Sequence, residues 1–337
     1  MKEKDNRQEK PAMTRCRNRP KNRPETTVTP VDLRAAAQSV VADIERMIAP
    51  RGQALSSLMT ALQTRECGRS SRPQRRLFFK QGALEQLEAE AYGLALLRLA
   101  ACNSGAEDLF VPRIHAILIA DDCAALAIEF LELRRAHGES LARFGRALGR
   151  LHALPVTHFG AAPDNFIGPT PQHNPDRDNW PDFFAEFRLS AIADALTRSA
   201  RGANSPRLPV GAFKALDQLC SRIHTFFDDR EVVPAYVHGD LWSGNYGALP
   251  NGRPCFFDPA AHAADPEVDL AMIELFGSPG AEFFAAYDSA RTIDCGFHRR
   301  KPLYNLYHLL NHCLLFGGRY CTDAADSIQK LLLETDR

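Results

Sequence analysis

The chain has no excess of charge of either sign and no long apolar run. Lysine plus arginine and aspartate plus glutamate each number 41 among the 337 residues, so the formal net charge is zero. This balance gives no reason to expect a polyanion such as nucleic acid, or an anionic membrane surface, as a partner. We therefore expect no nucleic-acid partner and no membrane partner, and a small or neutral substrate fits the composition better.

Cysteines in a regular pattern are also lacking. The nine cysteines include no CxxC pair and no group that stands with histidines at zinc-finger spacing. The sequence thus predicts neither a disulfide framework nor a structural metal. No apolar run reaches transmembrane length, and the N-terminus is charged and broken by proline where a signal peptide needs an apolar segment. These features favour a cytoplasmic location.

What the chain does have is a globular composition, with 45% hydrophobic and 24% charged residues. Residues 1–29 differ, because they are polar, of mixed charge and interrupted by three prolines. We predict a disordered tail there. Met13, Met47 and Met59 are further candidate starting points of the chain.

The hydrophobic pattern predicts a small sheet-containing lobe followed by a mainly helical lobe. Residues 31–48 read as one amphipathic helix, and a strand at 75–81 precedes a helix at 84–101. Two strands follow at 109–120 and 123–133. From residue 134 onward helices dominate, with predicted helices at 140–154, 178–196 and 210–227 and short strands at 234–240 and 255–260. We expect an α+β, two-lobed fold with an N-terminal lobe at 30–133, a helical lobe at 134–337 and a cleft between them.

The segment HGDLWSGN, residues 238–245, has the aspartate and asparagine spacing of a kinase catalytic loop. Asp240 is the predicted catalytic base. Asn245 and, further along, Asp258 at the end of a short apolar strand are predicted to hold Mg²⁺, which prefers hard oxygen ligands. The alternative is that Asp240 and Asn245 merely cap a turn. We expect His238 to support the loop and not to transfer a proton.

Lys80 lies near the end of a predicted strand, and Glu90 lies in the helix that follows. This is the arrangement of a lysine that contacts ATP phosphates and a glutamate that orients it. Glu85 and Glu88 are rival partners, and an ordinary surface ion pair is the alternative.

The segment AIEFLEL, residues 127–133, follows the two strands and precedes the helical lobe. In that position it predicts a hinge, in which Glu129, Phe130 and Leu131 would contact the adenine of ATP through exposed backbone groups and apolar side chains. Any edge strand has a similar composition, so the prediction depends on the position of residues 127–133 between the strands and the helical lobe.

With these residues in place, the chain resembles the fructosamine kinase family, or ketosamine-3-kinases, which share the fold of protein kinases and aminoglycoside phosphotransferases. The resemblance runs from about Leu77 to Tyr320, through LFFKQ, LEAEAYGL, DNFIG, WPDFFAEFRL, HGDLWSGN, DPAAHAADPEVDLAMIELFG and YNLYHLLNHCLLFGGRY. It implies a protein-kinase-like fold and a kinase with an alcohol acceptor. The implied reaction is the ATP- and Mg²⁺-dependent phosphorylation of the 3-hydroxyl of ketosamines, whose products shed the sugar and so deglycate the amine.

The resemblance also implies roles for particular residues. The LEAEAYGL register selects Glu90 as the glutamate that pairs with Lys80. The sugar site is implied near Asp164, Asn165, Trp180 and Trp242. Small ketosamines and glycated protein lysines are both implied as partners, whereas the preferred ketosamine and the oligomeric state stay open.

Two segments depart from the family pattern. Ala264, Asp265 and Pro266 stand where the family usually has glycine, aspartate and arginine. Residues 56–76 contain one glycine, Gly68, where the family has a paired-glycine turn that covers the ATP phosphates. We expect this atypical segment to be disordered or poorly packed and to weaken ATP binding. Two alternatives therefore stay open: a pseudokinase or binding protein with a degenerate phosphate loop, and another small-molecule kinase of the aminoglycoside phosphotransferase type.

Overall fold

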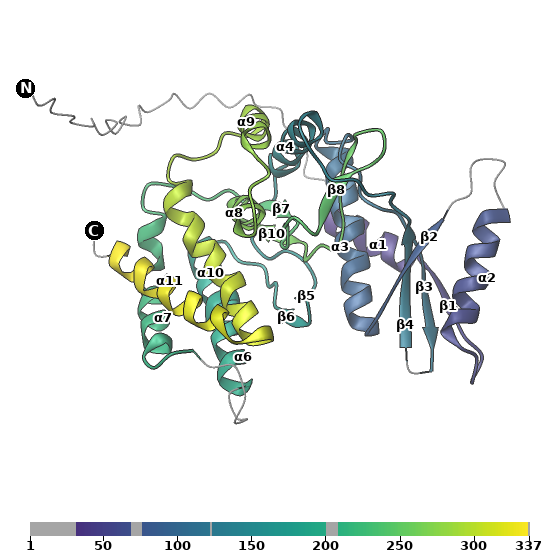
Figure 1. Ribbon diagram of the computed structural model, residues 1–337, viewed down its shortest axis with the longest axis horizontal. Helices are drawn as coiled ribbons and strands as arrows, with labels where there is room; N and C mark the ends of the chain where they lie inside the picture. Colours follow the sequence, from purple (N-terminus) through teal and green to yellow (C-terminus); the bar gives the residue numbers. More distant parts are fainter. Residues whose placement is uncertain (1–31, 69–75, 122, 200–207, 336–337) are drawn as a thin grey trace, which may run out of the picture.

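A computed structural model describes residues 32–68, 76–121, 123–199 and 208–335 (Figure 1). The tail predicted at residues 1–29 lies outside these ranges. The described chain forms a small lobe that contains a four-stranded sheet and a larger lobe that is mainly helical. The predicted α+β, two-lobed fold is therefore confirmed.

The sheet of the small lobe has the strand order β1-β3-β4-β2. Its strands are β1 (Glu45–Ile48), β2 (Leu77–Gly82), β3 (Ile114–Ala120) and β4 (Cys123–Glu129). β4 pairs antiparallel with both β2 and β3, whereas β1 pairs parallel with β3. The strands predicted on either side of the helix at 84–101 are therefore present, and β2 carries Lys80 beside the central strand β4.

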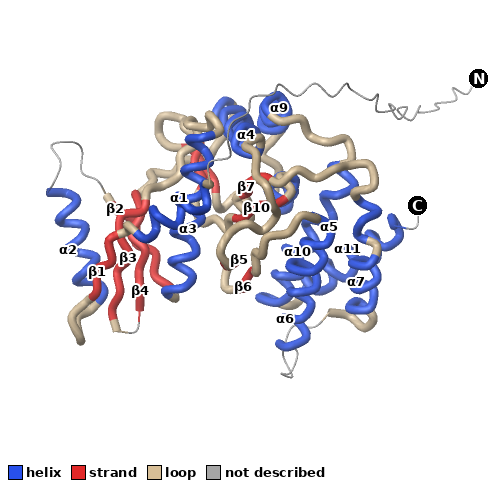
Figure 2. Tube along the Cα trace, turned by 180° about the vertical axis from the view of Figure 1, so that it is seen from behind, coloured by secondary structure: helices blue, strands red, loops and turns tan. Residues whose placement is uncertain are grey.

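Helices cover both faces of this sheet (Figure 2). Alternate residues of a strand point to opposite faces. Ile117 and Leu126 belong to the core that includes α3 (Leu84–Asn103) and α1 (Leu33–Ala42), whereas Leu118 belongs to a smaller cluster under α2 (Leu55–Gly68). The sheet is thus held between α3 and α2, which leaves the end of β2 free to face the cleft.

Two predictions for this lobe were wrong. Residues 31–48 do not form one helix, because α1 ends at Ala42 and β1 then pairs with the edge of β3, which satisfies backbone groups that a longer helix would use internally. The described part of segment 56–76 is not disordered. Leu55, Leu58 and Leu62 recur at helical spacing, and all three are buried against the sheet. Residues 69–75 lie outside the described residues.

The helical lobe contains the predicted helices, some of them divided. Its helices are α4 (Glu139–His152), α5 (Trp180–Phe184), a π-helical turn (Ala185–Ser190), α6 (Ala191–Ser199), α7 (Ala212–Ser221), a 3₁₀ turn (Ile223–Phe226), α8 (Glu267–Leu275), α9 (Ala281–Ala290), α10 (Phe297–Phe316) and α11 (Arg319–Thr335). In the chain as described, no helix is long and apolar enough to cross a membrane.

Three small two-stranded sheets lie between α3 and the helices of the large lobe (Figure 1). They pair β5 (Asn165–Ile167) with β6 (Thr170–Gln172), β7 (Ala235–Val237) with β10 (His262–Ala264), and β8 (Tyr246–Ala248) with β9 (Pro254–Phe256). The predicted catalytic loop connects β7 to β8, and Asp258 follows β9. The short sheets therefore hold both motifs at neighbouring strand ends.

The two lobes share one large hydrophobic core. It includes α1 and α3 of the small lobe together with most helices of the large lobe. At Gly93 of α3 an added Cβ would lie 3.1 Å from Pro259 Cγ and 3.3 Å from Ala261 Cβ. The close approach of α3 to the segment after Asp258 fixes the glutamate-bearing helix relative to the metal-ligand candidates.

The sequence predicted no disulfide framework, and the structure contains one disulfide that the sequence analysis did not foresee. Cys313 near the end of α10 is bonded to Cys321 at the start of α11. Gly317 and Gly318, with φ of 63° and 58°, make the turn that brings these two helix ends together. The spacing of the pair looks irregular in the sequence because the turn, and not a repeat, creates the contact. Both cysteines are buried.

Candidate active site

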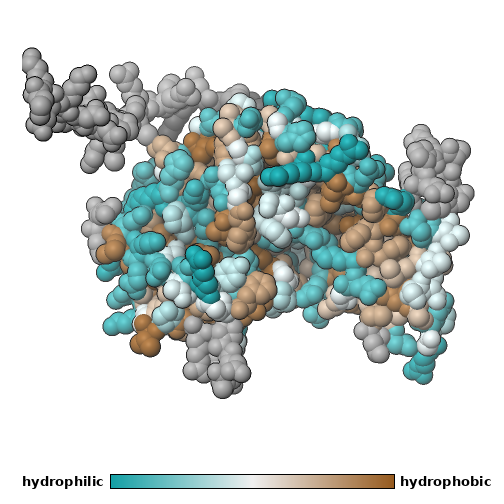
Figure 3. Space-filling model, in the orientation of Figure 1, coloured by the Kyte–Doolittle hydropathy of each residue, from teal (hydrophilic) through white to brown (hydrophobic). Residues whose placement is uncertain are grey.

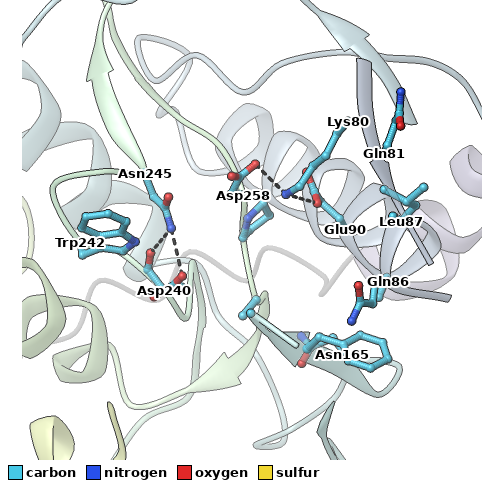
Figure 4. Close-up of a pocket in the computed structure, with 16 residues that line it drawn as sticks. Lys80, Gln81, Gln86, Leu87, Glu90, Asn165, Asp240, Trp242, Asn245 and Asp258 are labelled. Atoms are coloured by element: carbon cyan, nitrogen blue, oxygen red, sulfur yellow. Dashed lines mark hydrogen bonds and ion pairs between the residues drawn. The ribbon is translucent and has the colours of Figure 1, made fainter. Parts of the chain in front are cut away.

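Most of the predicted site residues line one cavity between the lobes. The cavity has a volume of about 400 Å³ and contains Lys80, Glu90, Asp240, Asn245 and Asp258 (Figure 4). These side chains come from β2, from α3, from the loop between β7 and β8, and from the segment that follows β9. Residues far apart in the sequence thus converge on one site.

Lys80 bridges two carboxylates. Its Nζ lies 2.6 Å from Glu90 Oε2 and 3.1 Å from Asp258 Oδ1. Of the two rivals to Glu90, Glu88 pairs instead with Arg46 at 2.6 Å, and Glu85 lies in the first turn of α3 and does not line the cavity. The lysine and glutamate chosen by the motif register are therefore the pair that meets in the cleft.

Among the described residues that line this cavity, acidic side chains outnumber basic ones. Burial alone would lower the pKa of Lys80, but Glu90 and Asp258 outweigh burial and raise it. Burial raises the pKa of Glu90, and Asp258 adds to this effect against the opposing attraction of Lys80. Burial also raises the pKa of Asp240 to about 7, although the hydrogen bond from Asn245 opposes the shift. Three carboxyl groups thus share one ammonium group, and a cation bound there would relieve their repulsion.

Asp269 holds the backbone of the catalytic loop in place through hydrogen bonds. Its carboxylate is fully buried and accepts hydrogen bonds from the backbone N–H of His238 at 2.7 Å and of Gly239 at 2.9 Å. His152 donates to the same carboxylate from Nε2 at 3.3 Å and accepts from the Tyr287 hydroxyl at Nδ1. These contacts hold the pKa of Asp269 below its usual range despite burial. Asp269 thus anchors the catalytic loop to helix α8.

His238 supports the loop through both ring nitrogens. Nε2 donates to the Phe257 carbonyl at 2.9 Å, and Nδ1 accepts from the backbone N–H of Asp240 at 3.3 Å. Burial lowers the pKa of His238 and so favours the neutral ring. The histidine therefore joins the loop to the segment that precedes Asp258, as its predicted structural role requires.

The turn around Asp240 requires glycine. Gly239 has φ of +81°, and a Cβ there would lie 2.3 Å from the Ala260 carbonyl oxygen. At Gly244 a Cβ would lie 2.3 Å from the Trp242 ring. Asn245 closes the turn, since its Nδ2 donates to the backbone oxygen of Asp240 at 2.8 Å and to Oδ2 at 3.0 Å. Asn245 can therefore cap the turn and bind a metal ion at the same time, because its Nδ2 makes the turn contacts and its Oδ1 is left for a cation.

Asp258 has a backbone conformation that non-glycine residues seldom adopt. Its φ is +56°, and its carboxylate lines the cavity that contains Asn245. Strained backbone of this kind is found preferentially at functional sites. Carboxylate and amide oxygens are the ligands that Mg²⁺ prefers. Together with the excess of carboxyl groups, these two residues fit a magnesium ion.

The predicted hinge does connect the two lobes. The N–H groups of Glu129 and Phe130 donate to the carbonyl oxygens of Arg113 and Arg76, so they are used within the small lobe. The Arg76 guanidinium also stacks on the Phe130 ring at 3.8 Å. Glu129, Phe130 and Leu131 line neither of the cavities that contain Asp240. Phe130 and Leu131 lie beyond the end of β4.

Three residues of the implied sugar site have mainly structural contacts. Asp164 accepts from the backbone N–H of Asn174 at 2.9 Å and contacts the His173 ring at 2.7 Å. Asn165 lines the cavity, but its Nδ2 donates to the Ala261 carbonyl. Trp180 is 1% exposed and donates from its indole to the Tyr304 hydroxyl, within the core. The structure therefore does not bring Asp164 or Trp180 to Asp240.

Trp242 lies on the side of Asp240 away from Lys80 (Figure 4). There a second cavity of about 430 Å³ begins, and it contains both Asp240 and Trp242. Further residues of its wall were not predicted as site residues from the sequence. They include Met272, Phe276, His308, Asn311, His312, Phe316 and Tyr320. The helical spacing of residues 308, 312 and 316 is the signal that would have placed them on one face of α10.

The departure at Ala264, Asp265 and Pro266 is accommodated by a buried ion pair. Asp265 accepts from both terminal nitrogens of Arg230, at 2.5 and 2.9 Å, and from the Tyr304 hydroxyl at 2.6 Å. It does not line the cavity around Lys80. This loop therefore contributes to the framework beneath the site.

The fold and the site together define a kinase with a protein-kinase-like fold, in which a lysine and glutamate pair faces an aspartate and asparagine loop across the cleft. Residues 59–334 match the family model described as fructosamine kinase. The chain belongs to the fructosamine kinase family.

Individual relatives agree with this assignment. A probable ketoamine kinase of Synechocystis sp. is 40% identical over 74% of this chain and 79% of its own length. A chloroplastic protein-ribulosamine 3-kinase of Oryza sativa subsp. japonica is 33% identical over 61% of this chain and 58% of its own length. The crystal structure of a putative fructosamine-3-kinase from Thermobifida fusca superposes with a TM-score of 0.68 at 29% identity, over 84% of this chain and all of that one.

Proposed function

We propose that the protein transfers the terminal phosphoryl group of ATP to the 3-hydroxyl of ketosamines. The observation that carries this proposal is the position of Asp240, which lines both the cavity of Lys80 and Asp258 and the cavity of Trp242. A phosphoryl donor in the first cavity and a hydroxyl acceptor in the second would meet at this carboxylate. In-line phosphoryl transfer requires such a meeting point.

Lys80, oriented by Glu90, is the proposed ligand of the ATP phosphates. Asn245 and Asp258 are the proposed ligands of Mg²⁺, which when bound neutralises charge on the transferring phosphoryl group. A cation would also replace Lys80 as the partner of Asp258, which frees the ammonium group for a phosphate oxygen. The proposed nucleotide site therefore explains why Lys80 lies between two carboxylates.

Asp240 is the proposed base. Its backbone is fixed through His238 and Asp269, and its Oδ2 accepts a hydrogen bond from Asn245. The other carboxylate oxygen is then available for the proton of an acceptor hydroxyl. Asp240 would thus orient the acceptor as well as accept its proton.

The proposed binding surface for the adenine ring of ATP lies at the hinge. Phe78 of β2 is 49% exposed and Phe130 is 37% exposed. The space-filling view shows hydrophobic residues on the surface of the small lobe around its strands (Figure 3). An adenine ring would cover such apolar groups beside Glu129 and Leu131.

ATP is proposed to bind more weakly than it would under a glycine-rich turn. The helix α2 packs on the face of the sheet away from α3, and none of its residues lines the cavity around Lys80. Residues 55–68, the described part of the chain directly before β2, therefore bring no backbone N–H groups close to the phosphates. The pseudokinase alternative rests on the same observation.

The acceptor class rests on the relatives. The proteins named ketoamine kinase and protein-ribulosamine 3-kinase support a ketosamine, either free or attached to a protein lysine. Loss of the sugar from the unstable product would then release the amine. This second stage makes deglycation the proposed outcome of the reaction.

The test is to incubate the purified full-length chain with MgATP and, in separate reactions, a ribulosamine, a fructosamine and an aminoglycoside. Release of ADP and the phosphorus NMR spectrum of the product identify the acceptor and the phosphorylated hydroxyl. We expect transfer to the 3-hydroxyl of a ketosamine, and loss of transfer when the cation is chelated. Transfer to the aminoglycoside alone would favour the second kinase type, and ATP binding without turnover of any acceptor would favour a pseudokinase.

A further inference from the structure

The cavity beside Trp242 has a buried floor and an exposed aromatic mouth. Met272, His308 and Asn311 on the floor are each at most 5% exposed. At the mouth Phe276 is 42% exposed and Phe316 is 67% exposed. A ligand that fills this cavity would therefore meet polar groups at its inner end and phenyl rings at its outer end.

The rings at the mouth form a continuous wall that begins near Asp240. Phe276 lies edge-on to Trp242 with ring centroids 6.3 Å apart, and it contacts the His312 ring at 5.3 Å. His312 in turn contacts Tyr320 at 5.0 Å and Phe316 at 5.5 Å. The cystine between Cys313 and Cys321 ties together the two helices that carry these last rings. The wall is thus a supported part of the cavity and not a set of separate surface residues.

We propose that Phe276 and Phe316 form a subsite for the amine substituent of the acceptor, and that they favour ketosamines whose nitrogen carries an aromatic or extended apolar group. This inference rests on the proposed function. The sugar of a ketosamine is rich in hydroxyls, which match the polar floor and Asp240. A short carbon chain separates its 3-hydroxyl from its nitrogen, so the substituent on that nitrogen leaves the floor and reaches the mouth.

The exposure of single apolar side chains would not carry this inference, because such residues are common on protein surfaces. Leu333 of α11 is 66% exposed, as much as Phe316, and it lines neither cavity that contains Asp240. Phe316 differs because it joins other aromatic rings at one opening, and grouped apolar surface of that kind marks binding sites. The two residues form a matched pair for an experiment.

The experiment measures binding to the full-length chain by calorimetry. The ligands are 3-deoxy analogues of N-benzyl and N-methyl ribulosamine, which lack the hydroxyl to be phosphorylated. We expect the benzyl ligand to bind about 10-fold more tightly, as one added aromatic contact allows. Phe316→Ser should remove most of this preference and leave the affinity for the methyl ligand unchanged. Phe316→Trp should retain the preference, and so should the control Leu333→Ser.

Equal affinity of the native chain for the two ligands, or no measurable binding of either, overturns the inference. An equal loss for both ligands in Phe316→Ser overturns it as well, because that result describes a structural role. Since binding of the deoxy analogues involves no chemistry, this test is separate from the proposed function. That function fails if no ketosamine with a 3-hydroxyl is phosphorylated, whatever the benzyl preference.

Discussion

The two walls of the cleft are held in place by different means. On the wall of the helical lobe, the backbone of the loop that carries Asp240 is bound by Asp269, whose carboxylate is 0% exposed. On the wall of the small lobe, the Lys80 side chain is 35% exposed and shares its charge between Glu90 and Asp258. Buried polar networks are rigid when every member is satisfied, whereas partly exposed ion pairs rearrange at little cost. Asp240 is therefore held in position before any ligand binds, whereas Lys80 can change its ion-pair partners when the phosphates bind.

The strongest test of this difference is Asp240→Asn. Removing the proton acceptor without changing side-chain size should lower turnover by about 10³-fold. ATP affinity and the free energy of unfolding should change little. Steady-state kinetics, nucleotide titration and denaturant unfolding measure the three quantities, and retention of most of the turnover would remove Asp240 from the role of base.

Next in size is the loss of the buried anchor. Asp269→Ala leaves two backbone N–H groups of the loop and the His152 ring without their acceptor, so the free energy of unfolding should fall by about 3 kcal/mol. Lys80→Met on the opposite wall should change it by only about 1 kcal/mol, because Glu90 can take up a proton. Denaturant unfolding compares the two variants. Similar losses would show that the walls are equally rigid.

The cystine extends the comparison to the outer part of the helical lobe. The double variant Cys313→Ser with Cys321→Ser should lower the free energy of unfolding by about 2.5 kcal/mol, because the closed loop is short. Cys102, a free and exposed cysteine, gives the control Cys102→Ser, which should have little effect. An unchanged unfolding midpoint in the double variant, measured without reductant, would contradict the stabilising role.

Asp258→Ala tests whether this carboxylate binds the nucleotide through a metal ion. The affinity for MgATP should fall by between about 10-fold and 100-fold, while the affinity for ATP without metal should stay nearly constant, because the carboxylate acts through the cation. Titration of nucleotide with and without Mg²⁺ separates the two. Equal losses would assign Asp258 a role apart from the metal.

The smallest effect is the dependence on pH. Because burial raises the pKa of Asp240 to about 7, the base is ionised above that pH and protonated below it. The value of kcat/KM should therefore fall by about 10-fold from pH 8 to pH 6. The folded chain binds a proton at Asp240 between about pH 4 and 7 that the unfolded chain lacks, so this group makes the fold less stable as pH rises through that window. A flat kcat/KM profile would contradict the raised pKa.

Local patterns in the sequence were sufficient for the motif residues and the main elements. Lys80, Glu90, Asp240, Asn245 and Asp258 were identified because phosphoryl transfer needs fixed residue types at fixed spacings next to strand ends. The structure brings all five to one cavity. The strands and helix around Lys80 and Glu90 followed from hydrophobic periodicity.

Other features depend on contacts between distant segments, which periodicity does not contain. The helix at 55–68 packs on one face of the sheet, and β1 pairs with β3 at its edge. Both elements depend on strands that come later in the chain. Trp180 was expected near the sugar, but burial against Tyr304 takes it into the core.

By itself, the sequence determined which side chains are able to perform the chemistry, because their types and spacings are local properties. Only the tertiary structure decided what surrounds them. Three features join segments that meet only after folding. They are the hydrogen bonds from the catalytic loop to Asp269, the cystine between α10 and α11, and the aromatic mouth of the cavity beside Trp242. Burial also decided the raised pKa of Asp240, since desolvation depends on the whole fold around a group and not on its neighbours in the chain.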